Sequence, residues 1–338
     1  MPTVEQQRTR TEAYLDRVLR RLWAWADEHH GGELEPMPGG FATAADMRKR
    51  HPPVLKPEFA DLNVVVTGHA GAAKEIRQAI TKPRRHQWYR SLRSSQALAQ
   101  SVFGAIKVCG RLDLLSGVTA ECGRLAFFDD HRGWSLGCEE PIRTLGEPAR
   151  SRTSIDVMLS GPGGARVAVE CKFTESEFGR CSRPRLRPKD PGYAAQRCDG
   201  CYHAQAGRAE RCALTAANIR YWDYLPSLFA WPKDADLSPC TFGRTYQLAR
   251  NALAATVMPD GTVDRDRGHV LVVYDANNPE FQAGGTAQAQ FDEASAACLE
   301  SGLLRRLSWQ RLMAPMARDA ALGPLVDKLH AKYGFDPT

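Results

Sequence analysis

The segment Thr153–Phe173 places the strongest constraint on how this chain can fold. Two runs rich in β-forming residues, TSIDVML and VAVECKF, stand on either side of the glycine- and proline-rich SGPGGAR. This pattern predicts a β-hairpin. If the hairpin is symmetric about Gly163, Asp156 lies opposite Glu170. Because side chains alternate along a strand, Lys172 shares a face with Glu170, and the hairpin gathers two carboxylates and an ammonium group.

Two carboxylates at this separation repel each other unless a cation lies between them. A hard divalent ion such as Mg²⁺ takes oxygen ligands and keeps several water molecules for chemistry. A metal site at Asp156 and Glu170 is therefore one interpretation of the hairpin. The alternative is an amphipathic hairpin with a solvated charged face, and the rest of the chain has to decide between the two.

Asp156, followed by Glu170-Cys171-Lys172 on an apolar strand, resembles the core motif of the PD-(D/E)XK nuclease superfamily, in a bacterial branch. Ile155 stands where the superfamily name has proline. The resemblance implies metal-dependent hydrolysis of phosphodiester bonds. It implies that Asp156, Glu170 and the backbone carbonyl of Cys171 hold Mg²⁺ or Mn²⁺. Lys172 would orient the attacking water and offset the charge that develops on the phosphate.

A helix predicted before the hairpin is expected to complete this site. The run SSQALAQSVFGAI offers Ser94 or Ser95 as an N-cap, followed by apolar residues at helical spacing. In the superfamily, a helix at this place often contributes a polar or acidic residue to the metal site. Gln96 is the candidate here, with Gln100 after it, although an amide is a weaker metal ligand than a carboxylate.

The order of the remaining predicted elements matches the superfamily core. Strands are expected at residues 63–66, 124–128, 134–142, 268–274 and 303–313, and helices at residues 4–30, 242–258, 288–302 and 321–334. We therefore expect an α/β, restriction-endonuclease-like fold with a mixed central sheet flanked by helices. Residues 1–82 are predicted to be an N-terminal helical and loop extension. Residues 83–338 are predicted to be the nuclease-like domain, with a cysteine-rich insertion at about 175–240.

The chain contains ten cysteines, a high number for a protein that is expected in a reducing compartment. The insertion is rich in arginine, proline and glycine, and a metal would supply the order that a small apolar core cannot. The predicted ligands are Cys181, Cys198, Cys201 and Cys212. Zn²⁺ is one candidate, and the resemblance adds a [4Fe–4S] cluster as the other. His203 or Cys240 could replace one ligand, and scattered reduced thiols are the alternative.

A formal net charge of +6 suits a polyanionic partner. DNA is the expected partner, and RNA is an alternative. Six basic residues are expected to contact phosphates. The alternative is that they lie in solvated loops and bind nothing. These residues are Arg84, Arg85, Arg183, Arg185, Arg187 and Lys189.

Other classes of protein fit the sequence less well. The glycine turn at residues 68–71 lacks the Gly-Lys-Ser/Thr of a phosphate-binding loop, and no His-x-x-x-His or His-Glu-x-x-His spacing occurs. Neither a membrane-spanning run nor a signal peptide is found, so we expect a cytoplasmic protein without a membrane partner. The resemblance allows a homodimer. The predicted function is Mg²⁺-dependent cleavage of DNA in restriction, defence or repair. The alternative is a metal-stapled nucleic-acid-binding or interaction module without catalysis.

Overall fold

The computed structural model describes residues 2–36, 43–68, 70–142, 144–148, 154–203 and 211–337. Its centre is a five-stranded sheet in the order β1-β2-β3-β4-β5. The strands are β1 (Ser135–Pro141), β2 (Ser154–Ser160), β3 (Arg166–Cys171), β4 (Gly268–Tyr274) and β5 (Leu304–Ser308). The first three strands pair antiparallel, while β4 and β5 run parallel to β3. The predicted α/β class with a mixed central sheet is confirmed.

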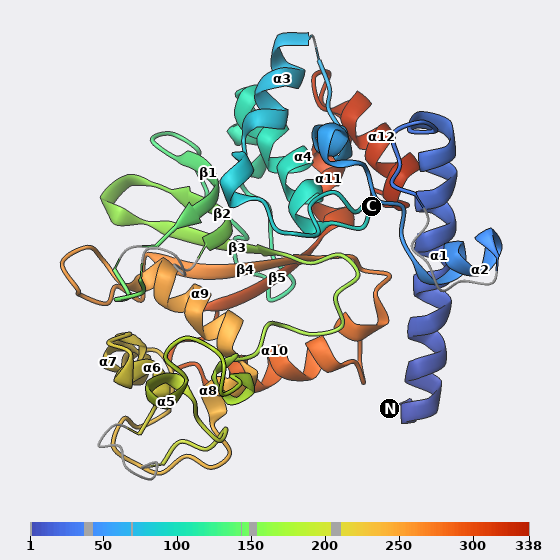
Figure 1. Ribbon diagram of the computed structural model, residues 1–338. Coiled ribbons are helices and arrows are strands. Elements are labelled where there is room, and N and C mark those ends of the chain that lie inside the picture. The colour runs from blue at the N-terminus through green and yellow to red at the C-terminus, as the bar shows by residue number, and fades with distance from the viewer. Residues whose placement is uncertain are drawn as a thin grey trace.

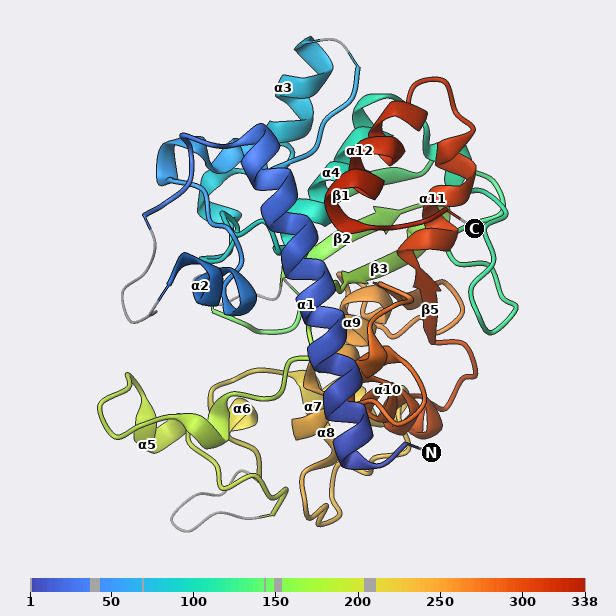
Figure 2. The same ribbon diagram turned by 90° about the vertical axis from the view of Figure 1, so that its right-hand side faces the viewer.

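Helices cover both faces of this sheet (Figure 1). One face carries α4 (Ser95–Val108), α11 (Trp309–Ala317) and α12 (Gly323–Tyr333), with α3 (Ala70–Gln78) beside α4. The other face carries α9 (Tyr246–Thr256) and α10 (Thr286–Ala297). The long helix α1 (Val4–His29) crosses one side of the molecule, from α12 to the neighbourhood of α10, with α2 (Ala44–Arg50) beside it (Figure 2).

The alternation predicted for the hairpin is present in β3. Val167 and Val169 point into the apolar core shared with α4, α11 and α12. Ala168 packs against Ala254 and Ala255 of α9. The face of β3 that carries Glu170 and Lys172 is therefore the face covered by α9.

Helix α1 belongs to the same core and reaches the end of the hairpin. Tyr14 is buried, and its hydroxyl donates hydrogen bonds to the carbonyl of Phe173 (3.0 Å) and to Asp275 Oδ2 (2.9 Å). The N-terminal region thereby secures the chain directly after Lys172. Among the described residues, no helix is both long and apolar enough to cross a lipid bilayer.

Three of the predicted strands are wrong in whole or in part. Residues 63–65 are buried and Val66 is half-buried, but they form no strand, and the N–H of Val65 donates to Ser101 Oγ (2.9 Å) instead. Residues 124–128 form isolated bridges to residues 116–119 rather than a strand of the sheet. The last strand ends at Ser308, whose hydroxyl caps α11, so residues 309–313 are helical. Most apolar residues of these runs are buried, Leu125 excepted, but the pattern did not determine the backbone conformation.

The cysteine-rich segment, residues 175–240, connects β3 to α9 on the side of the sheet that α9 covers (Figure 1). Its described residues form short helical turns: α5 (Tyr193–Gln196), α6 (Ala213–Ala216), α7 (Tyr221–Tyr224) and the 3-10 turns Arg183–Arg185 and Leu225–Ser227. The turn α8 (Thr241–Arg244) follows it and leads into α9. Stacked aromatic rings, such as Tyr202 on Trp222 with centroids 4.0 Å apart, provide its apolar core.

Candidate functional site

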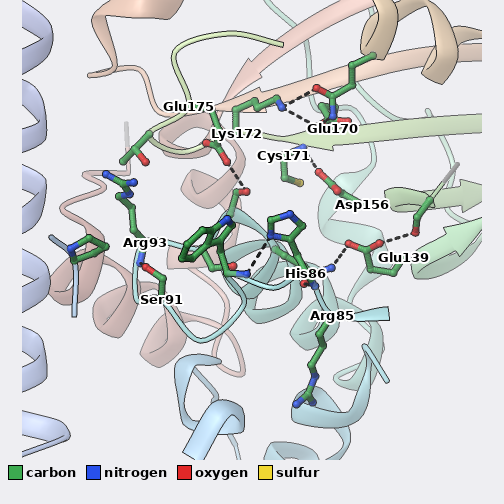
Figure 3. Close-up of a pocket in the computed structure, with 18 of the residues that line it drawn as sticks. Arg85, His86, Ser91, Arg93, Glu139, Asp156, Glu170, Cys171, Lys172 and Glu175 are labelled. Atoms are coloured by element: carbon green, nitrogen blue, oxygen red, sulfur yellow. Dashed lines mark hydrogen bonds and ion pairs between the residues drawn. The ribbon is translucent and has the colours of Figure 1, made fainter. Parts of the chain in front are cut away.

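Three carboxylates lie in a row across the first three strands of the sheet. The pairs Cys138–Val157 and Glu140–Ile155 place Glu139 of β1 opposite Asp156 of β2. The pairing of β2 with β3 continues toward Glu170 in the register predicted from the symmetric hairpin. The N–H of Cys171 donates to Asp156 Oδ2 at 2.8 Å, which fixes the Asp156 carboxylate at the hairpin. Figure 3 shows Asp156 between the other two acids.

Glu139 is the site residue that sequence analysis missed. It is buried and has a positive φ of 52°, a strained conformation for a residue with a side chain. Its carboxylate accepts hydrogen bonds from Ser154 Oγ (2.5 Å) and from Gln96 Nε2. Its carbonyl accepts a hydrogen bond from Arg84 Nη1 (3.2 Å). The only signal in the sequence was the pair of acids at the end of the strand before the hairpin.

Helix α9 holds Glu170 and Lys172 in place. The Glu170 carboxylate accepts hydrogen bonds from Gln247 Nε2 and Asn251 Nδ2, both at 2.7 Å, and lies 3.0 Å from Lys172 Nζ. Lys172 Nζ also donates to Gln247 Oε1 at 2.9 Å. Its backbone is fixed as well, because Trp309 Nε1 donates to the Lys172 carbonyl at 2.8 Å. Gln247 therefore bridges the two charged groups and orients both.

The charges of this cluster are unbalanced. Burial raises the pKa of Asp156 well above its usual range, and the negative charges of Glu170 and Glu139 add to the rise. Burial also raises the pKa of Glu139, against the hydrogen bonds from Ser154 and Gln96. Burial alone would lower the pKa of Lys172, but the surrounding carboxylates outweigh burial and raise it. The ammonium group is thus charged at neutral pH, and it forms an ion pair with Glu170.

The donor set fits a hard divalent cation. Such ions prefer carboxylate and carbonyl oxygens, and a second positive charge would relieve the repulsion among the three acids. Asp156 and Glu170, the two predicted ligands, are brought together as expected. Glu139 adds a third carboxylate beside them.

Gln96 lies next to the site, at the start of α4, but both ends of its amide are already engaged. Its Oε1 accepts the N–H of His86 at 2.8 Å, and its Nε2 donates to Glu139 and to the Arg84 carbonyl. Gln96 therefore positions Glu139 and the loop before α4. Gln100, the second candidate, is fully buried and donates to two carbonyls of the α3 region, so its contacts are those of a core residue.

A cavity of about 800 Å³ opens over the carboxylates. Basic and aromatic residues contribute to its walls, and they include Arg50, His51, Arg84, Arg85, His86, Trp88, Arg93 and Arg250. Trp88 is 61% exposed. Among the described residues, Arg250 Nε is a buried atom without a hydrogen-bond partner. The walls thus place positive charge and an exposed ring above the acidic row.

The predicted phosphate contacts divide into two groups. Arg84 is exposed on the cavity wall. Arg85 also lines the cavity, but its guanidinium points away from the carboxylates (Figure 3), pairs with Asp61 at 2.5 Å and lies over the Tyr89 ring. The other four belong to the cysteine-rich segment and are not among the described residues that line the cavity: Arg183, Arg185, Arg187 and Lys189.

Three of the four predicted cysteine ligands, Cys181, Cys198 and Cys212, lie near one another and near Cys240. Burial raises the pKa of the Cys181 thiol to about 12, and the nearby thiols of Cys212, Cys198 and Cys240 push it in the same direction. Cys201 lies instead with Asp199 and His203, whose ligand atoms are within 4.8 Å of one another and of its own. No disulfide joins Cys181, Cys212 or Cys240.

The unbalanced charge predicts that Asp156→Asn stabilises the protein in the absence of divalent ions. The raised pKa means that the ionised carboxylate opposes folding at neutral pH, whereas an amide oxygen still accepts the Cys171 N–H. We expect the free energy of unfolding at pH 8, in chelator, to rise by about 1–3 kcal/mol. The gain should shrink as the pH falls and vanish below about pH 4, where the unfolded carboxyl is also protonated.

Chemical denaturation across this pH range measures the effect. Asp266→Asn is the matched control, because Asp266 is an exposed acid far along the chain. A loss of stability in Asp156→Asn at pH 8, without a comparable change in the control, would show that the carboxylate row is not repulsive.

The comparisons with known proteins agree with this geometry. The profile of the family described as "Restriction Endonuclease associating with ARP" matches residues 20–334. The match spans all five strands and the hairpin with Asp156, Glu170 and Lys172. No curated protein and no solved structure gives a significant match. The chain therefore belongs to the restriction-endonuclease-like family described as Restriction Endonuclease associating with ARP.

Proposed function

We propose that this protein is a Mg²⁺-dependent nuclease that hydrolyses phosphodiester bonds of DNA. The observation that carries the proposal is the row of Glu139, Asp156 and Glu170 beside the ammonium group of Lys172, beneath a basic cavity. Membership of a restriction-endonuclease-like family supports the same class of reaction.

Each residue has a role that follows from its contacts. Asp156 and Glu170 would hold the ion together with the backbone carbonyl of Cys171, and Glu139 lies where it could join them. A bound Mg²⁺ would polarise the phosphoryl oxygens and lower the pKa of a bound water. Lys172 stays protonated, so it can orient the attacking water and offset negative charge on the phosphate. Gln247 keeps the ammonium group of Lys172 beside Glu170.

DNA is the proposed substrate because the cavity combines cations with an exposed ring. Arg84 and Arg93 on its walls would contact phosphates, and Trp88 offers a surface on which a base can stack. The family description supports a role in restriction, and defence or repair is proposed beside it. Since the family description includes association with ARP, we propose that such a partner acts together with the chain.

Cleavage of DNA by wild type and by Lys172→Ala tests this function. Supercoiled, linear and single-stranded DNA, with RNA in parallel, are incubated with Mg²⁺ or Mn²⁺. We expect wild type to cleave DNA and Lys172→Ala to lose at least about 10²–10³-fold in rate, because the charge on the phosphate is no longer offset. Circular dichroism should show the variant folded.

The control is Lys189→Ala, since Lys189 is exposed in the cysteine-rich segment. Equal cleavage by all three proteins would place the activity at another site or in a contaminant. Tight DNA binding without cleavage, with either ion and with the partner present, would favour the non-catalytic binding module instead.

Salt dependence of DNA binding separates the cavity wall from the cysteine-rich segment. Arg84→Ala should weaken binding and reduce the slope of log K against log salt by about 1, because one phosphate contact is lost. Arg187→Ala removes an equally exposed arginine outside the cavity and should leave the slope unchanged. Fluorescence anisotropy in chelator gives both slopes. Equal losses in the two variants would mean that DNA extends over the cysteine-rich segment.

A further inference from the structure

Four thiols that are far apart in the chain come together at the base of the cysteine-rich segment. The N–H of Cys181 donates to the carbonyl of Gly243 (2.9 Å), which places Cys181 beside the turn that begins at Cys240. The N–H of Cys240 donates to the carbonyl of Gly200 (3.0 Å), inside the knuckle that begins at Cys198. Backbone hydrogen bonds thus hold together three segments of the chain, those around Cys181, Gly200 and Cys240.

Cys212 joins this group from a fourth stretch of chain. Its neighbour Arg211 forms an ion pair with Asp236, four residues before Cys240. Cys212 packs against the same apolar cluster as Cys181 and Cys240, and all three are half-buried. Burial raises the pKa of Cys240 to about 11, with Cys212 and Cys198 again among the neighbouring groups that raise it.

We propose that Cys181, Cys198, Cys212 and Cys240 bind a thiophilic metal centre that staples the cysteine-rich segment to the start of helix α9. The shared chemistry is a set of four thiolates, which suits either Zn²⁺ or an iron–sulfur cluster. Cys201 is left outside the centre, in its own group with Asp199 and His203.

The segment needs such a centre because regular structure contributes little to it. In the part of the segment that the structure describes, the helices are single turns of three or four residues. Its strand pairing there consists of isolated bridges, Tyr202–Leu237 and Phe229–Cys298. Isolated turns of this length are not stable by themselves, whereas four thiolates bound to one metal centre supply free energy of folding.

The staple lies where the segment meets the candidate active site. Gly179, two residues before Cys181, donates its N–H to Gln247 Oε1 (2.7 Å) and accepts the N–H of Gln247 (3.1 Å). Cys240 leads through the single turn α8 into α9, which carries Gln247. The metal centre therefore fixes both sides of the contact that orients Lys172 and Glu170, and Gln247 is the positioning residue between them. This last step rests on the proposed function, whereas the metal centre does not.

Metal analysis of purified wild type and of single cysteine variants tests the centre. We expect wild type to carry about one zinc per chain, or about four irons with visible absorption if the centre is a cluster. Cys240→Ser and Cys181→Ser should lose most of this metal. Cys201→Ser and His203→Ala are the matched controls and should retain it. Metal lost from the two controls but kept in Cys240→Ser would overturn the assignment, as would metal-free wild type prepared without oxygen.

A second measurement uses wild type alone, so its result does not depend on whether the cysteine variants fold. Thiol alkylation before and after metal removal, mapped by mass spectrometry, should increase at the four proposed ligands and stay unchanged at exposed Cys122. Hydrogen exchange should accelerate around Gly179 and at the start of α9, while α4 stays protected. Unchanged alkylation at Cys240, or unchanged exchange around Gly179, would contradict the staple. Neither readout depends on DNA cleavage. A negative result would therefore contradict the metal centre without contradicting the proposed function.

Discussion

Electrostatic repulsion among three carboxylates is the constraint on which this structure depends. Glu139, Asp156 and Glu170 occupy neighbouring strands, and the sheet register brings them together. Lys172 forms an ion pair with one of them, Glu170. The surrounding hydrogen bonds from amides and from the Cys171 N–H hold the acids in place although they repel. A scaffold that keeps such a group together without its counter-charge is preorganised for a divalent cation.

The layers of the fold serve this arrangement. One face of β3 enters the main apolar core, so the opposite face can carry charge beneath α9. Trp309 and Tyr14 secure the backbone at Lys172 and Phe173 from the other side of the sheet. Gln247 then connects the charged pair to Gly179, so that the cysteine-rich segment is continuous with the site. Each layer thus limits the freedom of Lys172 in a different direction.

Local sequence patterns predicted the hairpin well, because the turn around Gly163 determines its register and places Asp156 toward Glu170. Glu139 could not be predicted in the same way. Its position depends on the pairing of β1 with β2 and on a positive φ, and neither leaves a mark in the spacing of residues. The thiols show the same limit: hydrogen bonds between distant stretches bring Cys240 near Cys181, and the spacing of cysteines along the chain does not reveal this proximity.

Mn²⁺ binding followed by electron paramagnetic resonance tests most directly whether the carboxylate row is a divalent metal site. We expect saturable binding to wild type and a large loss of affinity in Glu139→Gln, because one of the three carboxylate ligands is then an amide. Binding of equal strength in wild type and Glu139→Gln would contradict the three-carboxylate site. The absence of binding to wild type would contradict the metal site altogether.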